Sequence, residues 1–369
     1  MNRPAVQLNF IFLAETALFA GQHLMYALAG LLVCFLLGIS FPNTISAAQS
    51  DQQAADLVTE NQPIDITNPQ YLDLFRELQE QYHFPEPQLQ QLFAKLHIDR
   101  KVLQLMDRQG EAKPYHQYRS LFISPMTIAI GKQNLAIHQR LFDRIEERYQ
   151  VDREAIVAIW SIESRFGTSQ GNFSLFQTLN TLFAAYPRRS AFYRKELINF
   201  LILCRDNGFD PWSIKGSYAG AFGQAQFMPS SFNTYAVDFD GDQRPDIVNS
   251  LPDIFASIAH YLKEFGWIFH TPLYAELGRE LRSDMLIQAY TEGRKGRVDW
   301  RRLAKIQDVS LPQSPGDMPL SIVGLELAPQ DGSGMRYIAG YPNMHAINEY
   351  NHSSKYAMAV AEMAESLKN

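Results

Sequence analysis

The chain has 369 residues, of which 46% are apolar and 20% charged, a balance typical of folded globular proteins. Its formal net charge is −6 and it has no run of Lys or Arg, which argues against nucleic acid as a partner and against charge steering onto an anionic polymer. Of its two cysteines, Cys34 lies in an apolar N-terminal segment, and cleavage beyond it would leave Cys204 without a disulfide or a thiol metal cluster.

The N-terminus has the features of a targeting segment. Residues 24–41 form an uncharged apolar run, and the small residues Ser46 and Ala48 fit a signal-peptidase site. We interpret residues 1–48 as a signal peptide or, if uncleaved, as a membrane anchor, because the run is long enough to span a bilayer. A lipoprotein-like box ending at Cys34 makes lipidation a third alternative. All three place the remainder of the chain in the periplasm.

The next part of the chain divides by composition and periodicity. Residues 49–68 are polar and rich in Gln, Asp and Asn, which predicts a linker. Residues 69–115 hold two patterns with apolar side chains at helical spacing, separated by prolines, and predict a helical N-terminal part.

The remainder divides into three parts. Residues 116–267 predict a mostly helical core punctuated by Gly and Pro. Helical periodicity weakens over residues 268–341, where the short apolar runs 320–323 and 335–338 predict a small β-containing insertion. Residues 342–369 return to a helical pattern.

One predicted helix carries the first candidate for chemistry. Residues 151–167 read VDREAIVAIWSIESRFG, with Asp152 as a helix N-cap and Gly167 as a stop signal. Ile156 and Trp160 lie on the same helical face as Glu163, which therefore belongs to the stripe that is expected to be buried.

A buried Glu163 near the end of a helix has the properties of a general acid. Burial disfavours the ionised carboxylate, and the negative end of the helix dipole acts in the same direction. A raised pKa suits proton donation at neutral pH. The alternative is a boundary glutamate paired with Arg165 or another cation, and the pattern alone leaves both interpretations open.

Residues 216–231, GSYAGAFGQAQFMPSS, form a second candidate segment. Its three glycines allow close approach of backbones, and Gln224 and Gln226 are polar groups in otherwise small or apolar surroundings. The segment is either a tight substrate-facing turn, in which an amide contacts sugar groups, or a glycine-packed helix contact. It does not match the phosphate-binding glycine motifs.

Acidic residues at alternate positions, Asp238, Asp240 and Asp242, resemble the start of a calcium loop, which needs hard oxygen ligands. The match is imperfect, because Gln243 stands at the sixth position and Asn249 at the twelfth, where Gly and Glu are expected. An Asp-rich turn without metal is the alternative.

Further along, residues 350–356, YNHSSKY, open the last helical stretch and fit either a groove wall or a simple N-cap segment. Other enzyme classes lack support. There is no G-x-S-x-G elbow and no H-E-x-x-H motif, and the histidines are scattered without ligand spacing.

Five motifs follow one another in the chain: AIWSIESRFG, the turn at residues 186–189, GSYAGAFGQAQFMPSSF, AVDFDGD and YNHSSKYAMAV. In this combination the sequence resembles the membrane-bound lytic murein transglycosylase B family from about residue 69 to the C-terminus. The resemblance implies a mainly α (α+β) fold, with a lysozyme-like helical core, a helical N-terminal part and a small β-containing insertion. It implies that residues 116–267 are the catalytic core and that residues 342–369 complete the groove.

The resemblance also assigns roles to individual residues. Glu163 matches the catalytic acid/base of the family, and Gln226 matches the glutamine that contacts the saccharide. The remaining groove positions are Tyr118, Arg188, Arg189, Tyr261, Tyr350, Asn351 and Tyr356. The calcium-loop positions are Asp238, Asp240, Asp242 and Asp253, together with the carbonyl of Arg244.

The reaction that the resemblance implies is cleavage of the β-1,4 bond between N-acetylmuramic acid and N-acetylglucosamine in peptidoglycan, with formation of a 1,6-anhydro ring. It implies no catalytic cofactor and a structural Ca²⁺ ion. The expected partners are glycan strands and cell-wall synthesis proteins, without nucleic acid, and with membrane contact only through the N-terminal segment. The alternatives are a lysozyme-like muramidase, which hydrolyses the bond, and a non-catalytic peptidoglycan-binding protein.

Overall fold

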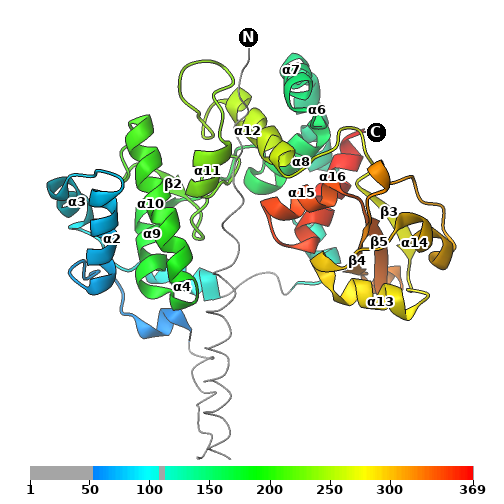
Figure 1. Ribbon diagram of the computed structural model, residues 1–369, viewed down its shortest axis with the longest axis horizontal. Coiled ribbons are helices and arrows are strands. Elements are labelled where there is room, and N and C mark those ends of the chain that lie inside the picture. Colours follow the sequence, from blue (N-terminus) through cyan, green and yellow to red (C-terminus); the bar gives the residue numbers. More distant parts are fainter. Residues whose placement is uncertain (1–52, 108–112, 369) are drawn as a thin grey trace, which may run out of the picture. The chain divides into compact units, whose positions relative to one another are not determined.

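The computed structural model describes residues 53–107 and 113–368, so the predicted signal peptide or anchor and Cys34 lie outside the described residues. Within the described part, helices dominate and the strands form one two-stranded and one three-stranded sheet (Figure 1). No helix in these ranges combines the length and the apolar character that crossing a membrane requires. Cys204 is buried as a free thiol.

The polar stretch before the first long helix is part of the fold and not a linker. The described helices up to the gap at 108–112 are η2 (Ala54–Leu57), α2 (Pro69–Glu80), α3 (Glu86–Phe93) and α4 (Arg100–Asp107). Helix η2 packs against α4, the Ile64 amide donates to the Leu96 carbonyl, and the Ile98 amide donates to the Gln62 carbonyl. The prediction of a linker over residues 49–68 is therefore wrong over its described part. Its polar side chains face solvent, and so its composition did not reveal the backbone pairing.

The N-terminal helices attach to the core through aromatic rings. The Asn68 side chain caps α2 by accepting a hydrogen bond from the Tyr71 amide at 3.0 Å, just ahead of Pro69 in the first turn. The Tyr71 ring lies 5.0 Å from that of Phe183 on α9, and its hydroxyl donates to Asn180 Oδ1 at 2.9 Å. Together these contacts hold α2 on the surface of α9.

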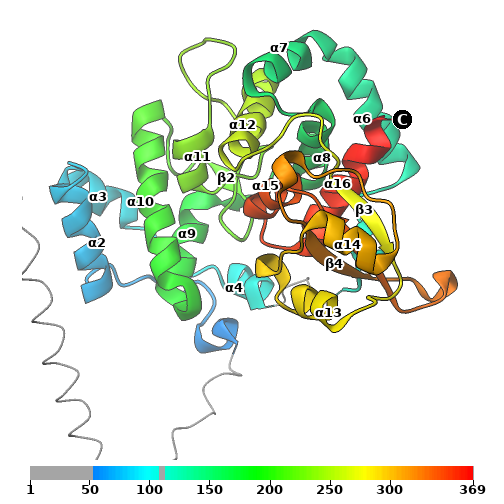
Figure 2. The same ribbon diagram turned by 45° about the vertical axis from the view of Figure 1, so that its right-hand side comes forward.

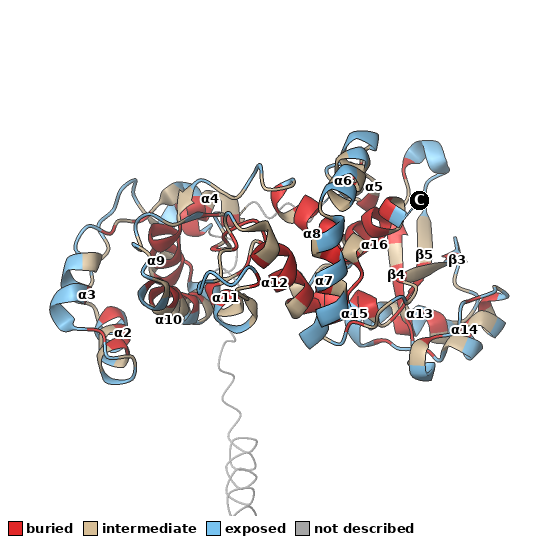
Figure 3. Cartoon of the chain, turned by 90° about the horizontal axis from the view of Figure 1, so that it is seen from above, coloured by how far each residue is buried: buried red, intermediate tan, exposed pale blue. Residues whose placement is uncertain are grey.

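The central part of the chain is helical, as its periodicity predicts. Its elements are α5 (Tyr115–Arg119), α6 (Pro125–Ile137), α7 (Gln139–Tyr149), α8 (Arg153–Ser164), β1 (Phe173–Ser174), α9 (Leu175–Ala185), η4 (Pro187–Arg189), α10 (Ser190–Asn207), β2 (Lys215–Gly216), α11 (Pro229–Tyr235) and α12 (Leu251–Glu264). Helix α8 packs against α6, α12 and α16, and all its residues from Ala155 to Ile162 are buried (Figure 3). The apolar stripe predicted for this helix is thus only a part of its buried surface.

Asp152 stands at the N-cap position of α8, but its carboxylate makes no capping hydrogen bond. It accepts instead from Trp267 Nε1 at 2.9 Å and lies 2.9 Å from His270 Nδ1. Asp152 therefore ties the start of α8 to the segment that leads into the three-stranded sheet.

The segment predicted as a small β-containing insertion holds that sheet together with two helices of its own. Its elements are β3 (Tyr274–Gly278), α13 (Asp284–Thr291), η5 (Gly293–Lys295), α14 (Trp300–Gln307), η6 (Pro315–Asp317), β4 (Ser321–Glu326), η7 (Pro329–Asp331) and β5 (Met335–Gly340). Strand β5 is central and antiparallel to both neighbours, with Ile338 opposite Val323 on β4 and Glu276 on β3. Side chains such as Leu286 and Leu303 build a second hydrophobic core beside the sheet. Both predicted apolar runs overlap strands, whereas the helices α13 and α14 make the segment more helical than its sequence suggested.

The chain ends with two helices that return to the central part. These are α15 (Asn343–Tyr350) and α16 (Ser354–Lys368). They contact each other, and α16 lies along α8 while α15 contacts α12 (Figures 1 and 2). The YNHSSKY motif forms the break between them, and so it brings Tyr350 and Tyr356 from two helices toward one place.

Candidate active site around Glu163

Glu163 is the next-to-last residue of α8. The residues that follow it pack closely against Gln224 and end the helix there. Arg165 and Phe166 follow in the left-handed region with φ of 50° and 57°, and Gly167 continues with φ of 83°. A Cβ at Gly167 would lie 2.4 Å from Gln224 Oε1, so this position requires glycine. The sequence therefore places Glu163 on the last rigid turn before an irregular segment.

Gln224 holds this turn against the glycine-rich loop. Its Oε1 accepts from Trp160 Nε1 at 2.7 Å, and its Nε2 donates to the Val248 carbonyl at 2.8 Å. Gln224 is buried, and its amide is thus a structural link between α8 and two loops. Of the two glutamines in this segment, Gln224 is therefore the packing residue.

The carboxyl group of Glu163 is adapted to hold a proton near neutral pH. Burial raises its pKa from 4.5 to about 7, although the Tyr356 hydroxyl, which donates to Oε1 at 2.6 Å, acts in the opposite direction. Part of Glu163 stays accessible to solvent. Arg165 is exposed, and Glu163 makes no ion pair within the described ranges, so the interpretation of a glutamate paired with a cation is wrong.

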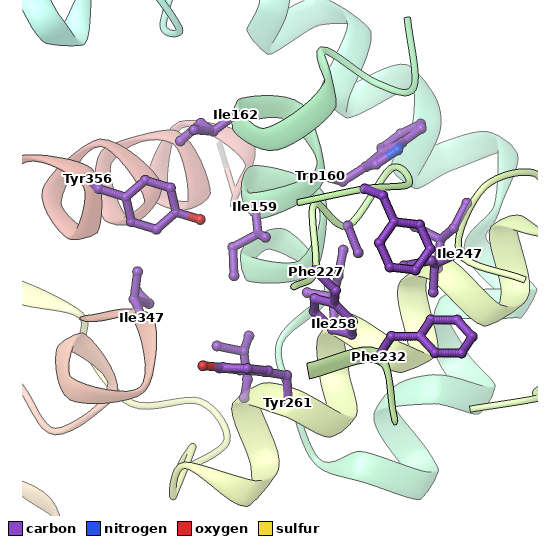
Figure 4. Packing of buried hydrophobic residues seen from close by; sticks show 14 of the residues in the cluster. Ile159, Trp160, Ile162, Phe227, Phe232, Ile247, Ile258, Tyr261, Ile347 and Tyr356 are labelled. Atoms are coloured by element: carbon purple, nitrogen blue, oxygen red, sulfur yellow. The ribbon is translucent and has the colours of Figure 1, made fainter. Parts of the chain in front are cut away.

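Tyrosine rings from three helices line the place where Glu163 emerges. Figure 4 shows the Tyr356 hydroxyl pointing from α16 toward Ile159 on α8. The Tyr350 hydroxyl donates to the Ala225 carbonyl at 2.6 Å, and the Tyr261 hydroxyl donates to a backbone carbonyl of α15 at 2.6 Å. The two rings lie 4.7 Å apart.

These phenols stay neutral. Burial, followed by the nearby Glu163, raises the pKa of both Tyr350 and Tyr356 well above 10. Tyr118 on α5 is close enough to raise the pKa of Tyr356 further. The structure thus brings Tyr118, Tyr350 and Tyr356 together with Glu163.

Gln226 lies in the glycine-rich loop with a left-handed backbone, at φ of 48°. Its Nε2 donates to the Gly223 carbonyl at 2.9 Å and to the Gln170 carbonyl at 3.2 Å. Both contacts fix the amide plane, so the orientation of its Oε1 is set by the protein.

Three predicted groove residues make no contact with Glu163 that the described residues reveal. Arg188 and Arg189 are exposed on η4, and the Arg189 guanidinium stacks over the Phe192 ring at 4.3 Å. Asn351 is exposed in the break between α15 and α16. Sequence motifs grouped these residues with Glu163, and the structure leaves all three exposed to solvent.

The acidic loop lies ahead of α12, and α12 contributes the fourth carboxylate of the predicted ligand set, Asp253. Asp238, Asp240 and Asp253 each offer one carboxylate oxygen within 4.8 Å of the others. Asp242 is not part of this group; its Oδ1 accepts from the Arg244 amide at 3.0 Å. Of the predicted ligand set, the structure therefore gathers three carboxylates.

Asp253 is fully buried and organises the loop. Its carboxylate accepts hydrogen bonds from the amides of Phe239 at 2.7 Å, Asp240 at 3.2 Å and Asp246 at 2.9 Å. Burial nevertheless raises the pKa of Asp253. These donors explain why the loop keeps its shape despite three neighbouring carboxylates.

Sequence reasoning missed a second buried glutamate, Glu362 on α16. Its Oε2 accepts from the Tyr115 hydroxyl at 2.9 Å and from Arg119 Nε at 2.5 Å, while Oε1 accepts from Arg336 at 2.5 Å. The available signal was a single charged residue inside the apolar run AMAVAEMA. Glu362 therefore clamps α5, which carries Tyr118, and β5 onto the helix that carries Tyr356.

Fold and site together define a class of protein. A mainly helical fold with one buried carboxyl group at a helix end, lined by neutral phenols, is the arrangement of a glycosidic-bond-cleaving enzyme of the lysozyme type.

Comparison with known proteins gives the family. Residues 67–365 match the protein family described as "Transglycosylase SLT domain". The chain is 31% identical over 312 residues to membrane-bound lytic murein transglycosylase B of Escherichia coli (strain K12), which covers 81% of this chain and 83% of that protein. The chain belongs to this lytic transglycosylase family.

Solved structures agree with this assignment. Soluble lytic transglycosylase SltB1 from Pseudomonas aeruginosa matches with a TM-score of 0.73 and 34% identity, over 81% of this chain and 98% of that one. The Escherichia coli lytic transglycosylase Slt35 in complex with calcium matches with a TM-score of 0.71 and 31% identity, over 84% of this chain and 96% of that one. The prediction of a mainly helical, lysozyme-like fold is confirmed.

Proposed function

We propose that this protein cleaves the β-1,4 bond between N-acetylmuramic acid and N-acetylglucosamine in peptidoglycan and leaves a 1,6-anhydromuramic acid end. The observation that carries the proposal is a single carboxyl group, Glu163, whose pKa is raised to about 7 and whose orientation the Tyr356 hydroxyl fixes at 2.6 Å. Its relatives are named lytic transglycosylases.

A pKa near 7 lets the same group act twice. In the first step, protonated Glu163 gives its proton to the glycosidic oxygen as the bond to C1 breaks. Positive charge on the sugar ring is then stabilised by the N-acetyl group of the substrate or by the local field. In the second step, the Glu163 carboxylate removes the proton of the muramyl 6-hydroxyl, whose oxygen bonds to C1. No water is consumed, so one carboxylate performs work for which most glycosidases need two.

The residues around Glu163 would hold the sugars on either side of the broken bond. Tyr118 and Tyr350, which are partly exposed, would offer apolar ring faces to the C–H faces of sugars, and the buried Tyr261 and Tyr356 would line the groove behind them. The amide of Gln226, whose Nε2 is fixed by two carbonyls, would direct its Oε1 at a sugar N–H or O–H donor. Arg188, Arg189 and Asn351 would contact parts of the substrate further from Glu163.

The acidic loop fits a structural calcium ion. Calcium takes oxygen ligands at 2.3–2.6 Å, so two ligands on opposite sides of one ion lie about 5 Å apart, and the oxygens of Asp238, Asp240 and Asp253 lie within 4.8 Å. We include Asp242 and the Arg244 carbonyl as the remaining ligands on the resemblance alone. The relative Slt35 is described in complex with calcium. The ion would neutralise the loop and take no part in bond cleavage.

The proposed place of action is the periplasm. The apolar run at residues 24–41 and the small residues that follow it support export, either with cleavage or as an anchor. Cell-wall synthesis proteins are the proposed partners beyond the glycan strand.

Digestion of purified peptidoglycan, followed by mass spectrometry of the released muropeptides, tests the reaction. We expect products that end in 1,6-anhydromuramic acid, one water lighter than hydrolysis products. Reducing muramic acid as the main product would assign the protein to the muramidases, and no release by the folded protein would leave a binding role.

A further inference from the structure

Helix α6 presents an apolar face to solvent. Its sequence, PMTIAIGKQNLAI, has one charged residue, Lys132, and Gly131 is its only buried residue (Figure 3). A Cβ at Gly131 would lie 2.6 Å from a methyl group of Leu367, so α6 packs closely against α16 through this glycine. The opposite face of α6 is therefore turned away from the rest of the protein.

The outward face of α6 carries no charge. At 3.6 residues per turn, the exposed residues of this helix lie along one stripe. The residues of the stripe are Pro125, Met126, Ala129, Gln133, Ala136 and Ile137. Met126 is 73% exposed and Ile137 64%, and Leu121, just ahead of the helix, is 49% exposed. Single exposed apolar side chains are ordinary, but a stripe without charge along a whole helix marks a contact surface.

The next helix in the chain shows what a solvated face looks like in this protein. All exposed residues of α7 except the first are charged; they are Gln139, Arg140, Asp143, Arg144, Glu147 and Arg148. The absence of charge on the outward face of α6 is therefore a property of this helix and not of the surface in general.

Basic residues accompany the apolar stripe. Residues 113–142 contain no Asp or Glu, although the net charge of the whole chain is −6. The basic residues in this range are Lys113, Arg119, Lys132 and Arg140. Arg119 pairs with a glutamate of α16, whereas Arg140, in the first turn of α7 directly after the stripe, is exposed and has no ion pair in the part of the chain that the structure describes. The surface is thus apolar along α6 and positive where α7 begins.

The size of the stripe favours a lipid surface over a protein partner. Helix α6 has 13 residues and is about 20 Å long, so a stripe about 10 Å wide along it covers about 200 Å². A stable protein–protein interface takes about 800 Å² from each partner. A helix with an apolar face and basic residues beside it can instead lie in the plane of a bilayer, with its apolar face buried about 5–10 Å deep.

We propose that the outward face of α6 rests on the surface of an anionic lipid bilayer. Met126 and Ile137 enter the boundary between headgroups and acyl chains, and Arg140 pairs with lipid phosphate. This contact does not depend on the proposed function, and it adds a second membrane contact to the one expected at the N-terminal segment. Since α6 packs against α8, which carries Glu163, the contact also fixes the orientation of the active site relative to the bilayer.

Fluorescence of the full-length protein in lipid vesicles tests this inference. Cys34→Ser removes the thiol of the N-terminal segment and Cys204 is buried, so Met126→Cys takes an environment-sensitive fluorophore at one position. The vesicles contain phosphatidylcholine and phosphatidylglycerol, with bromine on the acyl chains as the quencher. We expect quenching that increases with the phosphatidylglycerol content. Arg140→Gln should weaken the contact about fivefold, the contribution of one basic residue at a bilayer surface.

Glu147→Cys with the same fluorophore is the matched control, because Glu147 is exposed on the charged face of α7 and should not be quenched. Ile137→Asp in the labelled Met126→Cys protein should abolish the quenching, and thermal unfolding verifies that each variant is folded. Equal quenching at the two labelled positions, or quenching at neither, overturns the inference. Emission typical of apolar surroundings that bromine does not quench also overturns it, because α6 is then covered by the N-terminal segment or by a second protein chain.

Discussion

Two buried glutamates on neighbouring helices have opposite surroundings. Glu163 on α8 has one uncharged partner, the Tyr356 hydroxyl, and its pKa is raised to about 7. Glu362 on α16 is held by Arg119 and Arg336, with a tyrosine hydroxyl as a third donor. The same residue type in similar helical surroundings thus becomes a proton carrier where cations are absent and a structural clamp where they are present.

The largest expected effect is on activity. Glu163→Gln keeps the shape of the side chain and removes the transferable proton, so release of anhydromuropeptides should fall at least about 10³-fold, within the range of general acid–base catalysis. Circular dichroism should show an unchanged fold. Turnover close to that of the unmodified protein would sink the catalytic assignment.

Glu362→Gln should act mainly on stability. It leaves Arg119 without its carboxylate partner and Arg336 with Glu276 alone, which we expect to lower the free energy of unfolding by about 2 kcal/mol in urea titration. Glu365→Gln is the control, since Glu365 pairs with Lys368 on an exposed part of the same helix and should change stability by less than about 0.5 kcal/mol. Equal effects of both changes would contradict the clamp.

The difference in stability between the Glu163→Gln variant and the unmodified protein should depend on pH in a defined direction. Folding raises the Glu163 pKa from 4.5 to about 7, so its contribution to stability is fully present below pH 4.5 and is lost as the pH rises through 7. At pH 8 the variant should be more stable than the unmodified protein, by about 2 kcal/mol after allowance for partial exposure. At pH 4 the two should unfold alike, which denaturant titrations at both pH values measure.

Tyr356→Phe should move the pH profile of activity. The hydroxyl lowers the pKa of Glu163, so its removal should shift the alkaline limb of the kcat profile upward, by up to about one pH unit. Tyr350→Phe is the control, because its hydroxyl contacts the Ala225 carbonyl and not Glu163. A limb that moves equally in both variants would disprove the assigned role of Tyr356.

Calcium offers a third way to neutralise acidic side chains, with the smallest expected effect. At ten times its dissociation constant, the ion should add about 1.4 kcal/mol to the free energy of unfolding and raise the unfolding temperature by a few degrees. Asp240→Asn should remove this gain. Identical melting curves with calcium, magnesium and chelator would eliminate the metal site and leave Glu163 unaffected.

The sequence predicted one glutamate of the pair and not the other, for a physical reason. Glu163 and Gly167 are close in the chain, so local periodicity and a stop signal were enough to place the carboxyl group at a helix end. Glu362 depends on Arg119, which is 243 positions away, and no local pattern reports such a contact. The helical class followed from periodicity in the same way.

The errors have related causes. The hydrogen bonds from the Ile64 amide to the Leu96 carbonyl and from the Ile98 amide to the Gln62 carbonyl are backbone contacts that composition does not encode. The spacing of the acidic residues also did not reveal that Asp242 lies outside the group formed by Asp238, Asp240 and Asp253. The fold of the loop decides which carboxylates come together.

The sheet segment begins and ends at one point. The Tyr341 amide donates to the Leu273 carbonyl at 3.0 Å. The chain therefore leaves the helical body and returns to it at neighbouring positions. The segment between these positions has a hydrophobic cluster of its own around Leu286 and Leu303, so it is a candidate for replacement as a unit. Replacing residues 274–340 by the corresponding segment of a relative would exchange the sheet and its helices while leaving Glu163 and its helix unchanged, so the two parts of the chain can be engineered separately.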